Sequence, residues 1–484
     1  MQQFDFIFLH PPRTFMKPWL KTKRKVLGLL SPKRLRSVPS QYALVPMGLF
    51  SLASSLIQEG YTAKIVNLAI NQDLDPTFNM ATYIKSLQSE VFAIDMHWFT
   101  QTASALELAY LLKKHNPNSL IVLGGLTATH FHKQIIERYP FVDAVLLGEA
   151  DRSITRLAEA HFHHKELGEV KGIMYRDEKT IKYVVQEPPS NLDDFEFTQL
   201  ELLENYRSYL KMDVIGYSDL LSNRIWLNIA RGCPYNCIHC GGGKEAYYHF
   251  SLRENPLFRS PKRVADDIEK LSEYGIQGVC LSHDPEIFGE KYWSNLFKEI
   301  RRRAVEVHTY IESFRLPSKE FVKGLRQTFS STLISLSPET VSEDIREFIG
   351  RGFSNNELFK SIENIREEGL NVNVYFAIGL PGETSGLLKE YEGFVDKLFS
   401  LGAMVIPPFP YTIDPNCLMA LHPKKYGVRL LLKDVDDYKR ICSSSNPRDW
   451  IGHETISSKK DDIFTLQSTI NKYVTNLYQT HSSH

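Results

Sequence analysis

Three cysteines lie within eight residues, in the segment RGCPYNCIHC, and their spacing is C-x3-C-x2-C. Cys233, Cys237 and Cys240 follow a predicted strand, so a single loop carries three thiols. Thiolates on short loops of this kind hold iron–sulfur clusters, and three of them leave one iron of a cubane open. A structural zinc site completed by His239 or His249 is one alternative, but zinc prefers four closed ligands in paired C-x2-C elements. Three unrelated buried thiols are the other alternative, which this spacing disfavours.

The elements around the loop predict a barrel-like domain over residues 223–404. Strand patterns begin at Ile225 and alternate with helical stretches such as Lys262 to Tyr274 and Asn356 to Glu368. The strand segments are IWLNIA, GVCLSH, VHTYIES, TLISLS and VNVYFAIG. Such a series predicts a complete or partial (β/α) barrel, whose active site lies at the carboxyl ends of its strands.

Residues 1–165 predict a separate α/β domain. Phe4 to Leu9, TAKIVNL, Val91 to Met96, Leu120 to Leu123 and Ala144 to Leu147 are short apolar runs separated by helical patterns. This alternation predicts a Rossmann-like, doubly wound parallel sheet, which binds ligands beyond the carboxyl ends of its strands.

Length and composition agree with several globular domains. The chain has 484 residues, and at roughly 150 residues per domain this length predicts about three domains. Hydrophobic residues make up 43% of the chain. Lys plus Arg and Asp plus Glu each number 57, which excludes a wholly basic nucleic-acid coat protein and an acidic tail protein. Residues 166–222 predict a connector with a hairpin, and residues 405–484 predict a small mixed C-terminal region that helps to shape a substrate pocket.

The cysteine loop resembles the signature of the radical S-adenosylmethionine (SAM) enzymes, which place it after the first strand of a partial TIM barrel. The layout LHPP, P-x-G-L-x-S-L-A-x-x-L, GG and LLGEAD over residues 1–160 is similar to the N-terminal cobalamin-binding domain of one subgroup. The segment GLPGET at 379–384 resembles that subgroup too. The resemblance implies a 4Fe-4S cluster on the three cysteines, SAM bound at the open iron, and cobalamin.

The resemblance also implies cofactor-contacting residues. SHDPE at 282–286 stands where the family contacts the SAM amino group, although it departs from the usual Gly-Gly-Glu. The D-x-H-x-x-G motif that supplies a histidine to cobalt elsewhere is missing, so base-off cobalamin without a histidine ligand is expected. The implied SAM contacts are His283, Ser337, Glu339 and Gly379, and the implied cobalamin contacts are Pro11, Pro12, Thr100, Gly124, Gly125, Gly148 and Glu149.

Structural roles compete with some of these assignments. Gly124-Gly125 is also typical of an ordinary tight turn, and Gly148-Glu149 of a helix N-terminal turn with a favourably placed acid. His10, His97, His130 and His132 fall near strand ends, but a lone histidine is more often structural. Cys280 is interpreted as a core thiol, and Cys417 and Cys442 as inert, with a place near the substrate as the alternative for these two.

The resemblance implies an enzyme that cleaves SAM reductively and, as the commonest reaction type, transfers a methyl group to an unactivated carbon. Rearrangement, cyclisation or oxidation, with or without cobalamin, is the alternative within the enzyme class. A non-catalytic cobalamin or iron–sulfur sensor is the alternative outside it, and the open iron argues against that. A small-molecule or peptide substrate and an electron donor such as flavodoxin or ferredoxin are the expected partners.

No acidic residue occurs between Asp5 and Glu59, whereas nine basic residues lie within residues 13–36. This stretch is interpreted as a loop that covers the site, with nucleic-acid contact, membrane contact or a solvated loop as alternatives. The N-terminus shows no secretory leader pattern, which predicts a cytoplasmic protein. The basic residues are Arg13, Lys17, Lys21, Lys23, Arg24, Lys25, Lys33, Arg34 and Arg36.

Overall fold

The computed structural model describes residues 3–12, 47–75, 77–177, 180–210, 224–408 and 411–481. The basic segment 13–36 lies outside these residues. None of the described helices is both long and apolar enough to cross a membrane.

The first sheet contains the five parallel strands that the sequence predicts. Its order is β2-β1-β3-β4-β5-β6-β7, so the strand order reverses between β1 and β3. All pairings from β2 through β5 are parallel. The parallel strands are β1 Phe4–His10, β2 Ala63–Asn67, β3 Ser89–Asp95, β4 Leu120–Gly124 and β5 Ala144–Leu146.

Both faces of this sheet are buried, which explains why its strands are continuous apolar runs. Phe6 and Phe8 pack on one face, whereas Ile7 and Leu9 pack on the other, because successive side chains of a strand alternate. Helices α2 and α8 cover the first face, and α4, α5 and α7 cover the second. The helices of this domain are α2 Met47–Gln58, α3 Leu68–Leu74, α4 Met80–Ser86, α5 Thr102–His115, α6 Leu126–His130, α7 His132–Arg138 and α8 Ser153–Phe162.

The predicted hairpin after residue 166 extends the first sheet. Strands β6 (Ile173–Asp177) and β7 (Thr180–Val184) form it, and β6 pairs antiparallel with β5. The hairpin that was expected within a connector is therefore joined by backbone hydrogen bonds to the N-terminal domain. After it come two short helical segments, the second of which is α9 (Tyr206–Tyr209).

The second sheet is an open, partial barrel. Its order is β15-β14-β13-β12-β11-β8 with every pairing parallel, and among the described strands β8 and β15 are its edges. Its strands are β8 Arg224–Leu227, β11 Gly278–Leu281, β12 His308–Ser313, β13 Thr332–Glu339, β14 Asn371–Phe376 and β15 Met404–Val405. Its helices are α11 Pro261–Glu273, α12 Glu290–Arg302, α13 Lys319–Thr328, α14 Glu343–Phe348, α15 Asn355–Glu367 and α16 Leu388–Ser400.

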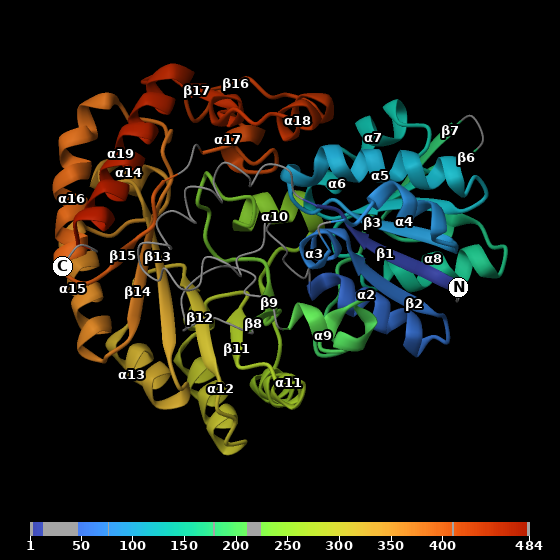
Figure 1. Ribbon diagram of the computed structural model, residues 1–484, viewed down its shortest axis with the longest axis horizontal. Helices are drawn as coiled ribbons and strands as arrows, with labels where there is room; N and C mark the ends of the chain where they lie inside the picture. The colour runs from blue at the N-terminus through green and yellow to red at the C-terminus, as the bar shows by residue number, and fades with distance from the viewer. Residues whose placement is uncertain are drawn as a thin grey trace.

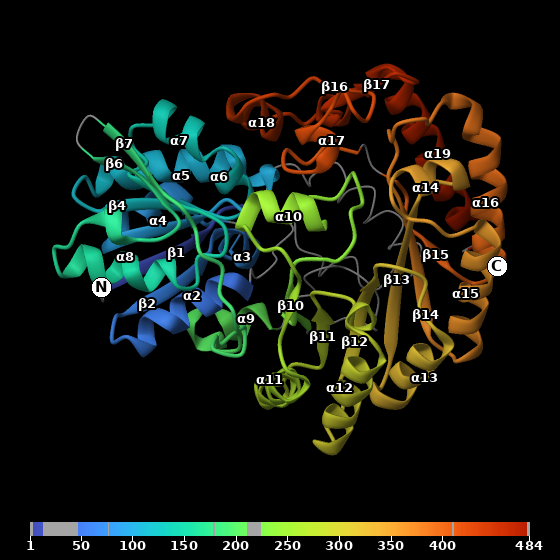
Figure 2. The ribbon, with the colours of Figure 1, turned by 180° about the vertical axis from the view of Figure 1, so that it is seen from behind.

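Smaller elements complete the chain. The strands β9 (Ala230–Arg231) and β10 (Leu257–Phe258) pair antiparallel on either side of α10 (Lys244–Ser251). The C-terminal elements cross from the second domain to the first, as Figure 2 shows along the top of the molecule. They are α17 Leu418–Leu421, β16 Val428–Leu430, α18 Val435–Cys442, β17 His453–Thr455 and α19 Lys460–His481.

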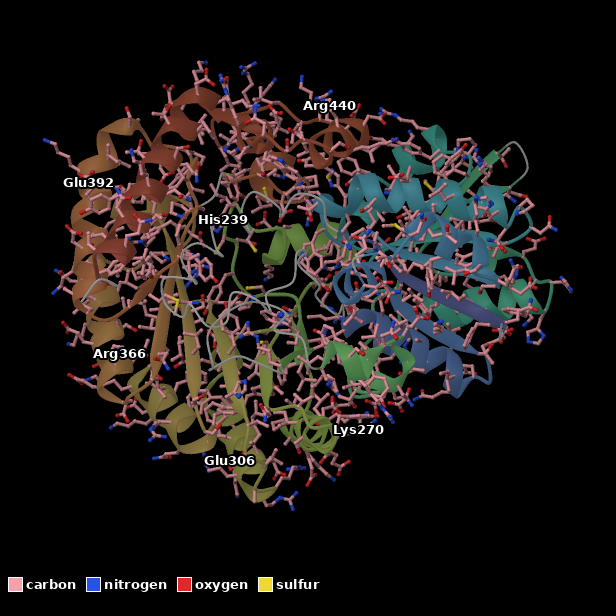
Figure 3. The ribbon with its side chains drawn as sticks, viewed as in Figure 1. His239, Lys270, Glu306, Arg366, Glu392 and Arg440 are labelled. Atoms are coloured by element: carbon pink, nitrogen blue, oxygen red, sulfur yellow. The ribbon has the colours of Figure 1, made fainter. Side chains whose placement is uncertain are left out.

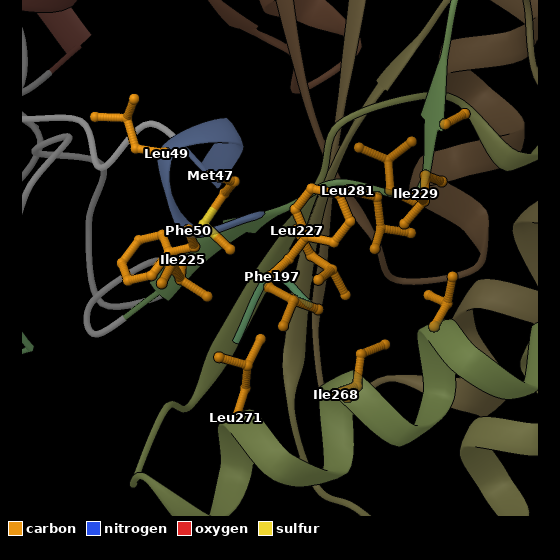
Figure 4. Close-up of a cluster of buried hydrophobic side chains, with 14 of the residues drawn as sticks. Met47, Leu49, Phe50, Phe197, Ile225, Leu227, Ile229, Ile268, Leu271 and Leu281 are labelled. Atoms are coloured by element: carbon orange, nitrogen blue, oxygen red, sulfur yellow. The ribbon is translucent and has the colours of Figure 1, made fainter. Parts of the chain in front are cut away.

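One continuous core joins the two domains. Phe50 of α2, Phe197, Leu227 of β8 and Ile268 of α11 belong to a single buried cluster (Figure 4). Figure 1 shows β1 running from the outer end of the first domain toward the middle of the molecule. The carboxyl edge of the first sheet therefore faces the second domain.

Candidate functional site

The cysteine loop lies between β9 and α10 and is fixed by backbone hydrogen bonds at several points. The N–H of Ile238 donates to the carbonyl of Ile349 (3.1 Å), and that of Lys244 donates to Tyr235 (2.8 Å). The N–H of Cys240 donates to the carbonyl of Cys237 (3.1 Å). These bonds hold the three thiols on one compact turn.

Positive charge and an N–H group point at the sulfur atoms. The guanidinium of Arg315 lies 3.9 Å from Cys237 Sγ, donates to the carbonyl of Gly350 (2.8 Å), and stacks 3.8 Å above the ring of Tyr235. The N–H of Gly242 lies 3.3 Å from Cys240 Sγ. Such donors stabilise thiolates and tune the potential of a cluster.

Burial raises the pKa of the Cys233 thiol to about 11. A bare thiolate is therefore unfavourable on this loop, and a bound metal must supply the free energy of deprotonation.

The side chains of the loop can be compared with the ligands of an iron–sulfur cluster. Three cysteine thiols on one loop, with N–H and guanidinium donors beside them, fit the ligand chemistry of such a cluster.

Two predicted SAM contacts lie beside the cysteine loop. His283 is the second residue after β11, and its Nδ1 is 3.0 Å from Ser282 Oγ, which accepts the N–H of Ile229 (3.1 Å). Glu339 ends β13, and its Oε1 lies 3.4 Å from Nε2 of His239. His239 belongs to the cysteine loop and is labelled in Figure 3. Glu339 has a φ of 65°, a strained backbone conformation for a non-glycine residue that is often found at functional sites.

The other two predicted SAM residues differ in their surroundings. Ser337 lies two residues before Glu339 on β13. Gly379 donates its N–H to Glu383 (2.8 Å) and accepts from His453 Nε2 (2.7 Å), and an added Cβ would lie 2.9 Å from Ile463. The φ of Gly379 is 112°. Packing against the C-terminal region is therefore sufficient to explain why position 379 is a glycine.

Four of the predicted cobalamin residues lie at the carboxyl edge of the first sheet. Pro11 and Pro12 follow β1 and are buried, and the carbonyl of Pro12 accepts from Ser104 (2.7 Å). Thr100 follows β3 and its buried Oγ1 has no hydrogen-bond partner among the described residues. Gly124 ends β4, and its carbonyl accepts from Met96 (2.8 Å).

Gly125 is required by packing inside the domain. Its φ is 106°, and an added Cβ would stand 2.6 Å from the Cα of His97. The ordinary tight-turn interpretation of this glycine is sufficient, because the chain segment it approaches is the backbone that follows β3.

Gly148 and Glu149 lie at the junction of the two domains. An added Cβ at Gly148 would lie 3.2 Å from the carbonyl of Phe250, in α10. The buried carboxylate of Glu149 pairs with Arg253 (2.6 and 2.7 Å) and Arg231 (3.1 Å), and accepts from Tyr247 (3.2 Å). Glu149 is thus held by side chains of the segment that surrounds the cysteine loop.

This ion-pair network brings the two candidate cofactor sites together. Arg231 stands two residues before Cys233 and also pairs with Asp151, which follows β5. The carboxyl edge of the first sheet therefore meets the strand that leads directly into the cysteine loop.

Residues 411–419 of the C-terminal region form hydrogen bonds to the cysteine loop that the sequence does not predict, and we call this segment the C-terminal wall of the loop. Tyr411 donates to the carbonyl of His239 (2.7 Å), and Asn416 donates to the carbonyl of Gly241 (3.0 Å). The N–H of Met419 donates to Ile238 (3.0 Å). The sequence around these residues carries no motif, and only the fold shows their role.

The three remaining cysteines are buried, as expected for inert thiols. Cys280 lies within β11, Cys417 precedes α17, and Cys442 ends α18 with its Sγ 3.2 Å from the carbonyl of Phe99.

Comparison with known proteins agrees with this geometry. The family model of the radical SAM superfamily matches residues 227–394, and that of the B12-binding domain matches residues 35–158. An uncharacterized methyltransferase of Pyrococcus horikoshii is 26% identical over 403 residues, which cover 79% of this chain and 81% of the relative. An anaerobic magnesium-protoporphyrin IX monomethyl ester cyclase of Cereibacter sphaeroides is 26% identical over 57% of this chain and 44% of its own.

Two solved structures share the fold over nearly the whole chain. The radical SAM methyltransferase TsrM from Kitasatospora setae, solved with cobalamin and a 4Fe-4S cluster, has a TM-score of 0.67 at 13% identity and covers 97% of this chain and 89% of its own. The cobalamin-dependent SAM radical enzyme OxsB has a TM-score of 0.63 at 14% identity and covers 96% of this chain and 66% of its own. By the family models, the chain carries a radical SAM domain over residues 227–394 and, ahead of it, a B12-binding domain over residues 35–158.

Proposed function

We propose that this protein is a cobalamin-dependent radical SAM methyltransferase that acts on an unactivated carbon of a small molecule or peptide. The observation that carries the proposal is the junction described above: Arg231 ties the carboxyl edge of the B12-binding domain to the cysteine loop. A methyl donor bound at that edge and a radical generated at the loop would share one reaction space.

The chain's own residues would perform distinct tasks. Cys233, Cys237 and Cys240 would hold the cluster, and Arg315 would offset the negative charge of its thiolates. His239 and Glu339, beside the open side of the loop, would orient the amino and carboxylate groups of SAM. Pro11, Pro12, Thr100 and Gly124 would line the cobalamin edge.

When bound, the cluster supplies an electron that cleaves one SAM, and cobalamin carries a methyl group from a second SAM. A reduced flavodoxin or ferredoxin is the expected source of that electron. The fold's contribution is to position the cofactors and to exclude water from the space between them.

Product analysis after anaerobic reconstitution with iron, sulfide and cobalamin tests this proposal. With dithionite and SAM, we expect both 5′-deoxyadenosine and S-adenosylhomocysteine. Cys237→Ala should lose the 5′-deoxyadenosine formation, because a cubane with two cysteine ligands is poorly held. Cys442→Ala, which removes a buried thiol that lies against the carbonyl of Phe99 in the first domain, should keep it.

The two products also separate methyl transfer from the other chemistries of related proteins. Formation of 5′-deoxyadenosine without S-adenosylhomocysteine would favour a cyclisation or rearrangement and contradict methyl transfer. Absence of both products in the presence of an intact cluster would contradict the enzymatic proposal as a whole.

A further inference from the structure

Exposed aromatic and aliphatic side chains gather on the surface beside the cysteine loop. Phe348, the last residue of α14, is 51% exposed, and its ring lies 6.4 Å from the ring of Tyr426. Ile456, which follows β17, is 88% exposed and donates its N–H to the carbonyl of Gly427 (2.9 Å), the residue after Tyr426. Apolar side chains that gather on a surface within a polar rim are typical of interaction sites.

Lysines border these apolar side chains. Residues 415–433 contain four Lys and Arg residues and no Asp or Glu. Two of the four, Lys424 and Lys425, are exposed, and Nζ of Lys425 lies 5.0 Å from the centre of the Tyr426 ring. We call the surface formed by Phe348, Lys424, Lys425, Tyr426 and Ile456 the docking patch.

The acids that flank the apolar side chains in sequence, Glu347 and Glu454, leave this surface positive. The carboxylate of Glu454 pairs with Arg429 and also lies 3.8 Å from Nζ of Lys459. The carboxylate of Glu347 lies against Gly352. Basic side chains therefore outnumber acidic ones around the exposed apolar groups, and such a surface complements an acidic protein.

A short path of covalent bonds and one hydrogen bond joins the docking patch to a cluster ligand. Phe348 precedes Ile349, whose carbonyl accepts the N–H of Ile238 (3.1 Å), and Ile238 follows Cys237. Sγ of Cys237 lies 3.6 Å from the carbonyl oxygen of Gly350. Ile238 and Ile349 belong to one buried hydrophobic cluster, which holds this path in place. Because electron transfer slows steeply with distance, a donor bound at the patch is well placed to reduce a cluster on the loop.

The proposed cleavage of SAM consumes one electron, which a partner protein has to bring to the cluster. We propose that the docking patch binds a small acidic electron carrier of the flavodoxin type. Carboxylates of the carrier would meet Lys424 and Lys425, and the apolar edge of its flavin would contact Phe348 and Tyr426. The inference rests on the proposed function and names the surface at which its electron donor binds.

One electron and no proton move in this encounter. The anionic flavin hydroquinone of the carrier gives up the electron and becomes the neutral semiquinone, and the cluster on the three cysteines is reduced by that electron. Electron-transfer complexes are small, with less than about 1,200 Å² of buried surface, and opposite charges raise their rate of association. A small patch with a basic rim suits such a complex.

Binding of oxidised flavodoxin to the cluster-loaded protein tests the docking patch without turnover, by isothermal titration calorimetry. We expect the affinity to fall at least about tenfold between about 0.01 M and about 1 M salt, because the screening length shortens from about 30 Å to about 3 Å. At low salt, Lys424→Glu combined with Lys425→Glu should weaken binding at least about tenfold, because attraction becomes repulsion. Phe348→Ala should weaken binding several-fold through the lost ring contact.

A matched control carries the same change of charge on a remote surface. Lys323→Glu combined with Arg326→Glu alters two exposed residues of α13, which Figures 1 and 2 show at the opposite end of the second domain from β16 and β17. This variant should bind flavodoxin as tightly as the wild type. Dithionite reduces the cluster without docking, so every variant should form 5′-deoxyadenosine normally with dithionite. Only the patch variants should be slow with reduced flavodoxin.

The outcomes separate this inference from the proposed function. Wild-type affinity in the Lys424→Glu, Lys425→Glu variant, or an equal loss of affinity in the α13 control, overturns the docking patch. Failure of the wild type to bind flavodoxin at low salt, while dithionite yields both products, also overturns it and leaves methyl transfer standing. Failure of dithionite to yield either product contradicts the proposed function, and the binding comparison still decides whether the patch takes an acidic carrier.

Discussion

Asp284 carries a carboxyl group that is almost completely buried between the ends of β11 and β12. Its two oxygens accept the backbone N–H groups of Glu286 and Phe314, each at 2.9 Å. Burial nevertheless raises the pKa of Asp284 to about 7, because the cost of desolvating the charged form outweighs these two hydrogen bonds.

A raised pKa makes the contribution of Asp284 to stability depend on pH. Between its ordinary pKa of 3.8 and the folded value, the native state binds more protons than the unfolded state. Stability from this group is therefore complete at low pH and is lost as the pH rises through about 7, by up to about 4 kcal/mol.

Asp284→Asn should remove that dependence. We expect the melting temperature of the wild type to fall more steeply between about pH 5 and about pH 8 than that of the variant, as measured by differential scanning fluorimetry. Asp177→Asn, an exposed carboxylate in the hairpin, should leave the wild-type slope intact. Equal slopes for wild type and Asp284→Asn would contradict the raised pKa.

At the scale of single residues, the sequence predicts contacts between residues that are near each other in the chain. The cysteine loop was identifiable because its ligands are three and four residues apart in one segment. The partners of His10 and Glu149 lie 85 and 104 residues away, so nothing near either residue indicates its pairing. The sequence around Glu149 predicts a cobalamin contact or an acid at a helix start, and it carries no sign of the pairing with Arg253.

At the scale of elements, β5 and α8 are fastened to β9 and α10 by a buried charge network. Glu149 and Asp151 supply the carboxylates, and Arg231 and Arg253 supply the guanidinium groups. Asp151 also accepts from Ser51 of α2 (2.6 Å). Every charge in the network has a partner of opposite sign, which offsets its desolvation.

Removing one member leaves a buried charge without its partner. Glu149→Ala should destabilise the protein by about 3 kcal/mol and expose the junction between the domains. Thermal unfolding and limited proteolysis would both report the change. Glu159→Ala, which breaks the exposed pair with Lys165, should leave the melting temperature nearly unchanged, because solvent screens this pair. Similar effects of the two substitutions would show that the network does not hold the domains.

Most elements could be predicted because their sequence periods are strong. The prediction of a helix over Ser104 to Lys114 corresponds to α5, and Phe4 to Leu9 corresponds to β1. The hairpin was also predicted, but its pairing with β5 was not, since an antiparallel edge strand carries no signal of which strand it joins.

At the scale of the whole molecule, the C-terminal region contacts both domains and the cysteine loop. Helix α18 packs against α5, and Tyr438 contacts the rings of Phe99 and Phe131. Helix α19 packs in the core of the second domain, where Tyr478 donates to the carbonyl of Val405 (3.0 Å). The segment between α16 and α17 lies against the loop through Tyr411 and Asn416.

This arrangement predicts that Asn416 protects the cluster more than it stabilises the fold. Asn416→Ala should lose iron to a chelator several-fold faster than the wild type, while the free energy of unfolding changes by only about 1 kcal/mol. Iron release and thermal unfolding measure the two effects. Asn471→Ala removes a comparable side-chain hydrogen bond, to the carbonyl of Pro408 (2.8 Å), and should leave iron release unchanged. Equal release rates in both variants would rule out a protective role for Asn416.

The sequence predicted a mixed C-terminal region that shapes a substrate pocket, but not its contact with the loop. The contacts join residues about 170 positions apart through single hydrogen bonds to backbone carbonyls, which any sequence provides.

The order of synthesis gives the C-terminal wall a consequence for maturation in the cell. Asn416 leaves the ribosome 175 residues after Gly241. At about 5–20 residues per second, the loop stays without that wall for roughly 10–35 s while the first domain is already able to fold. During this interval an iron–sulfur assembly factor would have access to the uncovered cysteine loop. Once the C-terminal residues are synthesised, they would pack against the loop and cover the inserted cluster.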